Sequence, residues 1–246
     1  MGNIKLVLEY DGSRYNGWQR QTNTRNTVQG RIEQVLHLMT GEKIELHGAG
    51  RTDKGVHALG QVANFHTRNQ MGLPEIEDYL HKYLPEDINL LDIREMPARF
   101  HSRLNAKGKK YSYRIWNHPF RKNIFNRDCC YHIRKPLNIE KMKEAAELFV
   151  GTRDFRSFTA LKSKNKSTVR TVSNIEVLKK GNEITIDFSG DGFLHKMVRV
   201  ITGTIIQVGL GELSVTEVEE MFKMGRREEA GFTAPPHALF LVKVVY

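Results

Sequence analysis

The sequence predicts an α+β fold of two similar halves, each a mostly antiparallel sheet with helices on one face. Three observations lead to this prediction. The chain has 246 residues, enough for one large or two small domains. Strand-like and helix-like apolar patterns alternate along it. No low-complexity segment or short repeat interrupts them. We expect a first domain at 1–102 and a second at 103–246.

The first half has the expected element order β-α-β-β-α-β. Residues 4–10 alternate in polarity and end at a turn signal, which indicates a strand. Apolar residues then recur at helical spacing over 28–39, between Thr27 as a plausible cap and Gly41 as a plausible stop. The other elements expected here are strands at 43–47, 62–67 and 88–96 and a helix at 73–84.

The second half begins near Arg103 and is expected to contain a similar mixture. A strand pair at 171–178 and 183–188 is joined through Lys180-Gly181-Asn182, a typical turn sequence. The other expected elements are strands at 109–116 and 239–245, a helix at 139–149, and helices starting at Phe193 and Thr216.

The charge of the chain favours a polyanionic partner. Lys and Arg number 38 against 28 Asp and Glu, which gives a formal net charge of +10. A solvated basic surface is the alternative, but the basic residues gather in three acid-free stretches, a pattern that suits a phosphate backbone. Those stretches hold Arg14, Arg20, Arg25 and Arg31; Arg99, Arg103, Lys107, Lys109, Lys110, Arg114, Arg121 and Lys122, with Tyr111, Tyr113 and Trp116 among them; and Lys162, Lys164, Lys166 and Arg170.

Cysteine usage and hydropathy indicate a cytoplasmic protein. The two cysteines, Cys129 and Cys130, are adjacent, so they form neither a spaced metal motif nor a disulfide framework. No charged start is followed by an apolar run, and no stretch of 18 apolar residues occurs. We therefore expect a chain that is neither exported nor membrane-spanning.

The most unusual local string is Gly48-Ala49-Gly50-Arg51-Thr52-Asp53-Lys54-Gly55-Val56-His57-Ala58. Its glycines imply a tightly shaped backbone. Asp53 is either a functional carboxylate or a cap for a helical turn that starts at Lys54, and spacing alone does not separate these readings. The glycines match neither the P-loop nor the dinucleotide fingerprint. Asp53, His57 and His66 form a weak metal hypothesis, because lone histidines beside strands are more often structural or RNA-contacting.

Residues 50–58 resemble the signature of the tRNA pseudouridine synthase A family. The resemblance extends over nearly the whole chain, through Tyr10-Asp11-Gly12, Gly17-Trp18-Gln19, Lys110-Tyr111-Ser112-Tyr113-Arg114, Asp154-Phe155-Arg156-Ser157-Phe158, Gly192-Phe193-Leu194, Met197-Val198-Arg199 and Thr233-Ala234-Pro235. The departures are Ser102, where Ala is common, and Pro236-His237-Ala238, where a Gly usually precedes Leu239. These departures affect the rim of the expected pocket.

The resemblance implies a role for each site residue. Asp53 is the nucleophile and Arg199 its basic partner, Tyr111 stacks on the flipped base, Arg51 helps to displace that base, and Leu239 contacts the substrate. It implies two halves joined around a central RNA-binding cleft, a homodimer, no cofactor and no metal. The substrate implied is tRNA, at uridines 38, 39 and 40 of the anticodon stem-loop. The residues expected to bind RNA are Arg14, Arg20, Lys109, Lys110 and Arg114.

The residues themselves are consistent with that chemistry. Apolar side chains occupy several faces of the expected helix at 194–210, so Arg199 would need an anion nearby. Pseudouridine has the same atoms as uridine, so its formation requires no redox carrier, phosphoryl donor or metal. Two rival hypotheses are a noncatalytic RNA-binding protein on the same scaffold and a metal-dependent hydrolase that uses Asp53 and His57.

Overall fold

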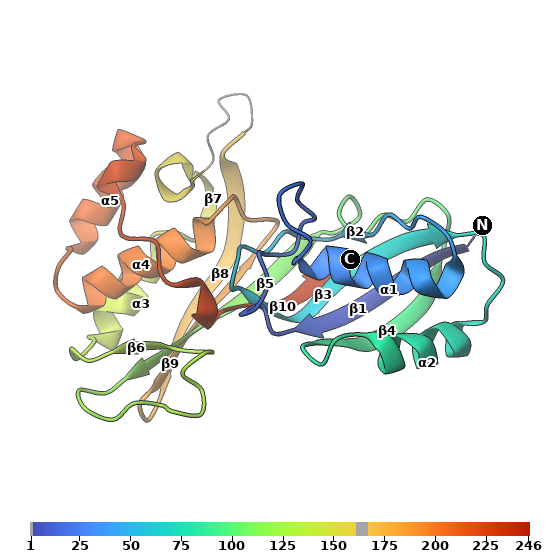
Figure 1. The fold of residues 1–246 in the computed structure, drawn as a ribbon. Helices are drawn as coiled ribbons and strands as arrows, with labels where there is room; N and C mark the ends of the chain where they lie inside the picture. The colour runs from blue at the N-terminus through green and yellow to red at the C-terminus, as the bar shows by residue number, and fades with distance from the viewer. Residues whose placement is uncertain (1, 161–166) are drawn as a thin grey trace. The chain divides into compact units, whose positions relative to one another are not determined.

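The computed structural model describes residues 2–160 and 167–246, which form two compact units (Figure 1). Unit 1 contains the chain up to Lys107 together with Phe240–Tyr246, and unit 2 contains Gly108–Leu239. The sequence analysis placed the boundary at 102/103 and the last strand in the second half. The structure differs because Phe240 and Leu241 pair with β3, a strand of unit 1.

Unit 1 is a mostly antiparallel sheet with two helices. Its strand order is β4-β1-β3-β10, with the short β2 beside β3. β1 pairs antiparallel with both β3 and β4, whereas β10 runs parallel to β3. The helices contact each other, and the second also packs on β4. The elements are β1 (Gly2–Tyr10), α1 (Val28–Thr40), β2 (His47–Gly48), β3 (His57–Thr67), α2 (Leu73–Tyr83), β4 (Ile88–Met96) and β10 (Leu239–Val245).

Helix α1 begins and ends where the sequence predicts. The Thr27 hydroxyl accepts the backbone N–H of Gly30, and Gly41 ends the helix in the left-handed conformation by donating its N–H to the His37 carbonyl. Ile32 and Leu36 are fully buried, so the apolar face of α1 packs into the core of unit 1.

The predicted strand at 43–47 is wrong. Only His47 and Gly48 pair with β3, opposite Asn64 and Ala63. The backbone of Leu46 has partners from α1 instead: its N–H donates to Glu33 Oε1 at 3.1 Å, and its carbonyl accepts Gln29 Nε2 at 2.9 Å. Two side chains of a helix therefore satisfy the backbone groups that a strand neighbour would otherwise bind.

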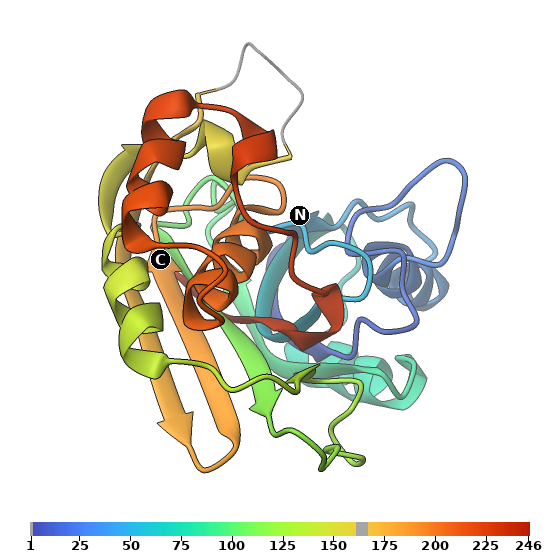
Figure 2. The same cartoon turned by 90° about the vertical axis from the view of Figure 1, so that its left-hand side faces the viewer.

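Within its described residues, unit 2 repeats the architecture with three α-helices. Its strand order is β5-β9-β8-β7, all antiparallel, and β6 pairs parallel with β5. One helix, α3, contacts β8 and both other helices (Figure 2). The elements are β5 (Gly108–Asn117), β6 (Tyr131–Ile133), α3 (Ile139–Glu147), β7 (Gly151–Asp154), β8 (Val169–Lys180), β9 (Glu183–Gly190), α4 (Met197–Gly209) and α5 (Val215–Met224), with 3-10 turns at Arg156–Phe158, Arg227–Glu229 and Pro236–Ala238.

Two features of unit 2 differ from the sequence analysis. β6 and β7 were not predicted, because three and four residues are too short to show a period. The helix expected from Phe193 begins at Met197, since Lys196 adopts the left-handed conformation with φ +60°. A residue in the left-handed conformation cannot be part of a right-handed helix, so α4 begins after Lys196.

The predicted fold class is confirmed. Both units combine a mostly antiparallel sheet with helices, which is an α+β architecture. Within the described residues, no helix has the length and apolar character needed to cross a membrane.

The contacts of Glu33 with Leu46 generate a stability prediction. Glu33 is 7% exposed and accepts hydrogen bonds from Leu46, Gln29 and Arg20. Glu33→Ala leaves the buried N–H of Leu46 without an acceptor, so we expect a loss of about 1–3 kcal/mol in the free energy of unfolding, measured in urea. Glu144→Ala, at an exposed helix position, is the control. Equal losses in the two variants would contradict this account.

Candidate active site

The segment that carries Asp53 is a tight turn between β2 and β3. The N–H of Val56 donates to the Asp53 carbonyl at 3.1 Å, and Gly55 has φ +77°, the conformation that the third position of a type II turn requires. Asp53 itself is half-buried, and Lys54 is exposed. No helix begins at Lys54, so the helix-cap explanation of Asp53 is wrong. Asp53 is instead the first residue of a β-turn, whose hydrogen bond its backbone carbonyl accepts.

Thr52, the residue before Asp53, is held by two separate parts of unit 1. Its carbonyl accepts the N–H of Trp18 at 3.1 Å. Its hydroxyl shares a hydrogen bond with the Tyr10 hydroxyl, with 2.8 Å between the oxygens. Thr52 is 7% exposed and Tyr10 is 4% exposed, so both contacts are shielded from water. The backbone leading into Asp53 is therefore fixed before the turn begins.

Gly17 lets the segment 11–19 lie directly against this turn. Its φ is +89°, and a Cβ at this position would lie 2.7 Å from the Thr52 carbonyl oxygen and 3.2 Å from the Asp53 carbonyl carbon. No other residue combines that conformation with that space. Gln61 fixes the start of the loop, because its Nε2 donates to the Gly50 carbonyl at 2.8 Å.

Arg51 lies at the surface of the same loop. It is exposed, and its Nε donates to Gln19 Oε1 at 3.0 Å. Arg51 and Asp53 thus belong to one loop but differ in environment. The Arg51 side chain is accessible to a large ligand, whereas hydrogen bonds hold the backbone at Asp53 in place.

His57 follows the turn directly, as the first residue of β3, and its side chain is held by packing and hydrogen bonding. It is 2% exposed, its ring stacks on Phe240 at 4.7 Å, and its Nδ1 lies 3.0 Å from Asp11 Oδ1. Burial favours the neutral acid of Asp11, but hydrogen bonds from Ser13 and the imidazole outweigh it and lower the pKa of Asp11. Among the residues that the structure describes, no group of three His, Cys, Asp or Glu side chains could hold a metal.

In unit 2, Tyr111 lies in the middle of β5 on its buried face. The ring is 8% exposed and meets Phe193 edge to face, with 5.3 Å between centroids. The alternation of β5 places Lys110 and Arg114 on the opposite, exposed side, whereas Lys109 shares the face of Tyr111. The three basic residues expected to bind RNA therefore do not share one face.

Arg199 lies on α4, a helix buried on almost every side, as the sequence predicts. The guanidinium is half-buried, and its Nε donates to the Ala234 carbonyl at 2.7 Å while the Ala234 N–H donates back to the Arg199 carbonyl. Tyr113 donates its hydroxyl to the adjacent Pro235 carbonyl at 3.0 Å. Arg199 and Tyr113 thus anchor the segment 234–235. Leu239, the first residue of β10, is buried.

The expected RNA-binding residues of unit 1 lie at its surface. Arg14 is 82% exposed and pairs with Asp87 at 3.6 Å, whereas Arg20 pairs with the buried Glu33 at 2.9 Å. Arg14 is therefore the better placed of the two for a phosphate contact. Of the third basic stretch, Lys162, Lys164 and Lys166 lie outside the described residues.

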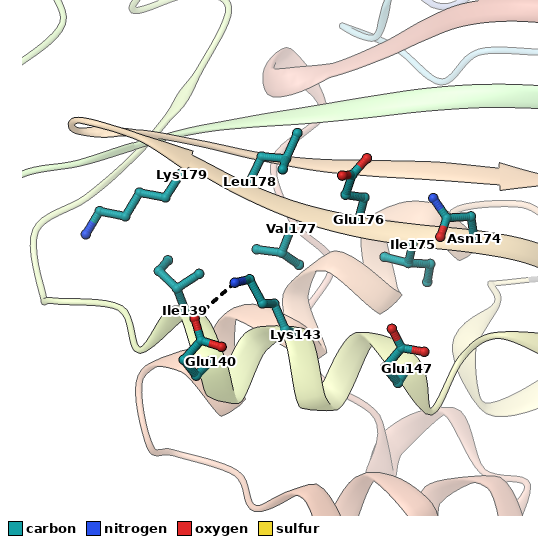
Figure 3. A pocket seen from close by; sticks show the side chains of 10 residues that line it. All are labelled: Ile139, Glu140, Lys143, Glu147, Asn174, Ile175, Glu176, Val177, Leu178 and Lys179. Carbon is teal, nitrogen blue, oxygen red and sulfur yellow. Dashed lines mark hydrogen bonds and ion pairs between the residues drawn. The ribbon is translucent and has the colours of Figure 1, made fainter.

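A concave surface of unit 2 is lined by none of these residues. It runs between α3 and β8 and is lined by Ile139, Glu140, Lys143, Glu147 and residues 174–179 (Figure 3). Glu140 and Lys143, one turn apart on α3, pair with each other at 3.0 Å. It contains no residue that the sequence analysis singled out, and its mixed charges do not favour a polyanion.

The comparison with protein families decides the assignment. The family described as tRNA pseudouridine synthase matches residues 6–105 and 145–246. This chain belongs to the tRNA pseudouridine synthase family.

Relatives at high identity support the same family over the full chain. The tRNA pseudouridine synthase A of Bacillus sp. (strain KSM-64) is 48% identical over 232 residues, covering 94% of this chain and 95% of that protein. The tRNA pseudouridine synthase A 2 of Bacillus anthracis and the tRNA pseudouridine synthase A of Acetivibrio thermocellus are 44% and 42% identical, each over the whole of both chains.

A solved structure, the Cbf5-Nop10-Gar1 complex, contains a chain with a TM-score of 0.37 and 16% identity. The match covers 82% of this chain and 45% of that one, a likeness too distant to define fold or function.

The departures from the family pattern have ordinary structural explanations in this synthase. Ser102 is fully buried, its N–H donates to Asn64 Oδ1 at 2.8 Å, and its hydroxyl donates to the His47 carbonyl. His237 Nε2 lies 3.1 Å from the Cys130 carbonyl. Both polar side chains are therefore satisfied within their own units.

Sequence reasoning found the loop of this synthase but missed what supports it. The sequence analysis names Tyr10, Gly17 and Trp18 only within motifs of the family resemblance. It names Thr52 only as a neighbour of Asp53 in the glycine-rich string. A local signal existed for one of them: a glycine two residues after Tyr15 and directly before Trp18 indicates a close backbone approach. The partner of that approach is 35 or more positions away, where no local pattern reveals it.

Gly17 allows a test of the close approach with a matched control. Gly17 and Gly41 both have positive φ, +89° and +73°, but a Cβ at Gly41 would meet nothing within 4 Å. Both alanine variants carry the cost of the left-handed conformation, about 1–2 kcal/mol. Only Gly17→Ala must also displace the Thr52 backbone. We expect turnover of a tRNA transcript to fall at least about tenfold in Gly17→Ala and to stay near wild type in Gly41→Ala.

Both variants are assayed well below their thermal transitions. Equal turnover in the two would show that the contact with Thr52 does not matter for the reaction.

Proposed function

We propose that this protein isomerises uridine to pseudouridine in tRNA, at positions 38, 39 and 40 of the anticodon stem-loop, with Asp53 as the nucleophile. The observation that carries the proposal is the placement of Asp53: within a full-length match to tRNA pseudouridine synthases, it opens a turn whose preceding residue is fixed from two sides. A carboxylate on so constrained a backbone suits a reaction that requires accurate attack.

The chemistry rearranges the atoms of one nucleotide. The bond between N1 and C1′ breaks, the uracil turns, and C5 bonds to C1′; C5 loses a proton and N1 gains one. This sequence requires a carboxylate able to form and release a covalent bond, a surface that holds the detached uracil, and a base for the C5 proton. Asp53 provides the first of these functions.

We propose that the other two site residues come from unit 2. The Tyr111 ring is already packed against Phe193, so it can receive a base without losing much conformational entropy. Arg199 lies on a buried helix, where a guanidinium is favoured by a nearby anion. Within unit 2, buried Leu239 contributes an apolar wall.

Binding of the RNA follows from charge and exposure. Exposed Arg14, Lys110 and Arg114 supply phosphate contacts, and exposed Arg51 is placed to enter the space that the flipped base vacates, which offsets part of an unstacking cost of about a few kcal/mol. Lys109 and Arg20 also contribute to RNA binding, but less than the three exposed residues. We further propose a cytoplasmic homodimer that acts without a cofactor.

Replacement of the nucleophile is the central test. We expect Asp53→Asn to abolish pseudouridine formation in an unmodified tRNA transcript and to leave the dissociation constant for tRNA within about tenfold of wild type, because no phosphate contact is removed. Asp92→Asn, which removes a carboxylate paired with Arg94 on β4, is the control and should turn over normally.

Turnover by Asp53→Asn would refute the catalytic role. Wild-type protein that binds the transcript but converts no uridine would favour a noncatalytic RNA-binding protein. Activity that disappears in excess chelator would favour metal chemistry.

The stacking role of Tyr111 is tested by separating its ring from its hydroxyl. Tyr111→Phe keeps the edge-to-face contact with Phe193 and should retain most of the single-turnover rate. Tyr111→Ala removes the stacking surface, which is worth about 1–3 kcal/mol per base, so the rate should fall by about 5- to 150-fold. Trp116→Ala, an aromatic of the same strand on the other face, should keep the rate. A wild-type rate in Tyr111→Ala would remove Tyr111 from the pocket.

A further inference from the structure

The Tyr10 hydroxyl is an unusual group at the end of an apolar strand face. Ile4, Leu6, Leu8 and Tyr10 share the buried face of β1, and the first three are aliphatic. A phenylalanine would fill the same volume without a polar atom to desolvate. Burying a hydroxyl is unfavourable unless it finds a partner, and this one is hydrogen-bonded to the Thr52 hydroxyl at 2.8 Å.

Thr52 transmits that contact to the carboxylate through a single peptide unit. Its carbonyl is bound by Trp18 N–H, its hydroxyl is bound by Tyr10, and the next residue is Asp53. After Asp53 the backbone is closed again by the bond from Val56 to the Asp53 carbonyl. The Asp53 backbone, and with it the direction of the Cα–Cβ bond, is therefore restrained on both sides.

We propose that Tyr10 is a positioning residue for pseudouridine formation: its buried hydroxyl, through Thr52, sets the direction in which the Asp53 carboxylate points. This inference rests on the proposed function of Asp53. Tyr10 itself is 4% exposed, so it does not meet the substrate. It acts through its hydrogen bond with Thr52, with the Gln61 side chain as a second neighbour of the hydroxyl.

Two features separate Tyr10 from a general packing residue. Its ring already packs with Trp18 at 5.9 Å between centroids, so the ring alone supplies the hydrophobic contribution. Burial also raises the pKa of Tyr10 well above its usual value, which keeps the hydroxyl protonated throughout an assay. Loss of the hydroxyl should therefore lower the rate equally at every pH, without moving either limb of the pH profile.

The experiment compares single-turnover rates of variants that change only the hydrogen bond. Tyr10→Phe and Thr52→Val each remove one partner, the double variant removes both, and Thr52→Ser keeps the hydroxyl. We expect Tyr10→Phe and Thr52→Val to slow pseudouridine formation by about tenfold to a hundredfold, the range that a small misplacement of a reacting group produces. The dissociation constant for tRNA should stay within about twofold, and Thr52→Ser should stay near wild type.

Tyr15→Phe is the matched control. Tyr15 is also 4% exposed, and its hydroxyl donates to Asp87 rather than to the Asp53 loop. It should lose stability in urea as Tyr10→Phe does and yet keep the wild-type rate. The double variant should be no slower than the slower single variant, because both changes break the same bond.

A wild-type rate in Tyr10→Phe, an equal rate loss in Tyr15→Phe, or additive losses in the double variant would overturn the proposal. Failure of the proposed function is distinguishable from these outcomes. If wild-type protein forms no pseudouridine, or if Asp53→Asn remains active, the function itself is wrong. If Asp53→Asn is inactive and Tyr10→Phe is normal, only the positioning role fails.

Discussion

The contact between the Gly17–Trp18 backbone and Thr52 is the constraint on which the rest of the candidate site depends. It joins a loop next to β1 to a loop before β3 at a distance that excludes any Cβ. Because the two backbones touch, neither loop can move without the other. The proposed nucleophile, Asp53, can then lie on an irregular segment and still have a fixed backbone.

Much of the fold could be predicted because its signals are local. α1 has a capping Thr27 and a terminating Gly41 in sequence, and β4 was predicted with the bounds that the structure shows. The failures arise where the deciding interaction is distant. Residues 43–46 are not a strand because Glu33 and Gln29, on a helix, bind the Leu46 backbone. No period or propensity within 43–47 contains that information.

The same division applies to the site. The motif around Asp53 could be found from the sequence, and its turn follows from Gly55. The hydrogen bond between Tyr10 and Thr52 spans 42 positions, and a lone tyrosine at a strand end is ordinary in any sheet. Only the fold shows that its hydroxyl reaches the residue before the carboxylate. The sequence thus identifies the proposed nucleophile, whereas the structure was needed to find what holds its backbone.

The two units fix the positions of their proposed site residues in different ways. In unit 1 the carboxylate sits on a turn, and long-range contacts supply the rigidity that a turn lacks. In unit 2 Tyr111 and Arg199 sit on regular elements, a strand and a buried helix, and both elements are tied to the segment 234–235 through Tyr113 and Arg199. The proposed nucleophile Asp53 should therefore be more sensitive than the proposed stacking residue Tyr111 to substitutions in distant supporting side chains. A loop loses its geometry when a single restraint is removed, and a strand does not.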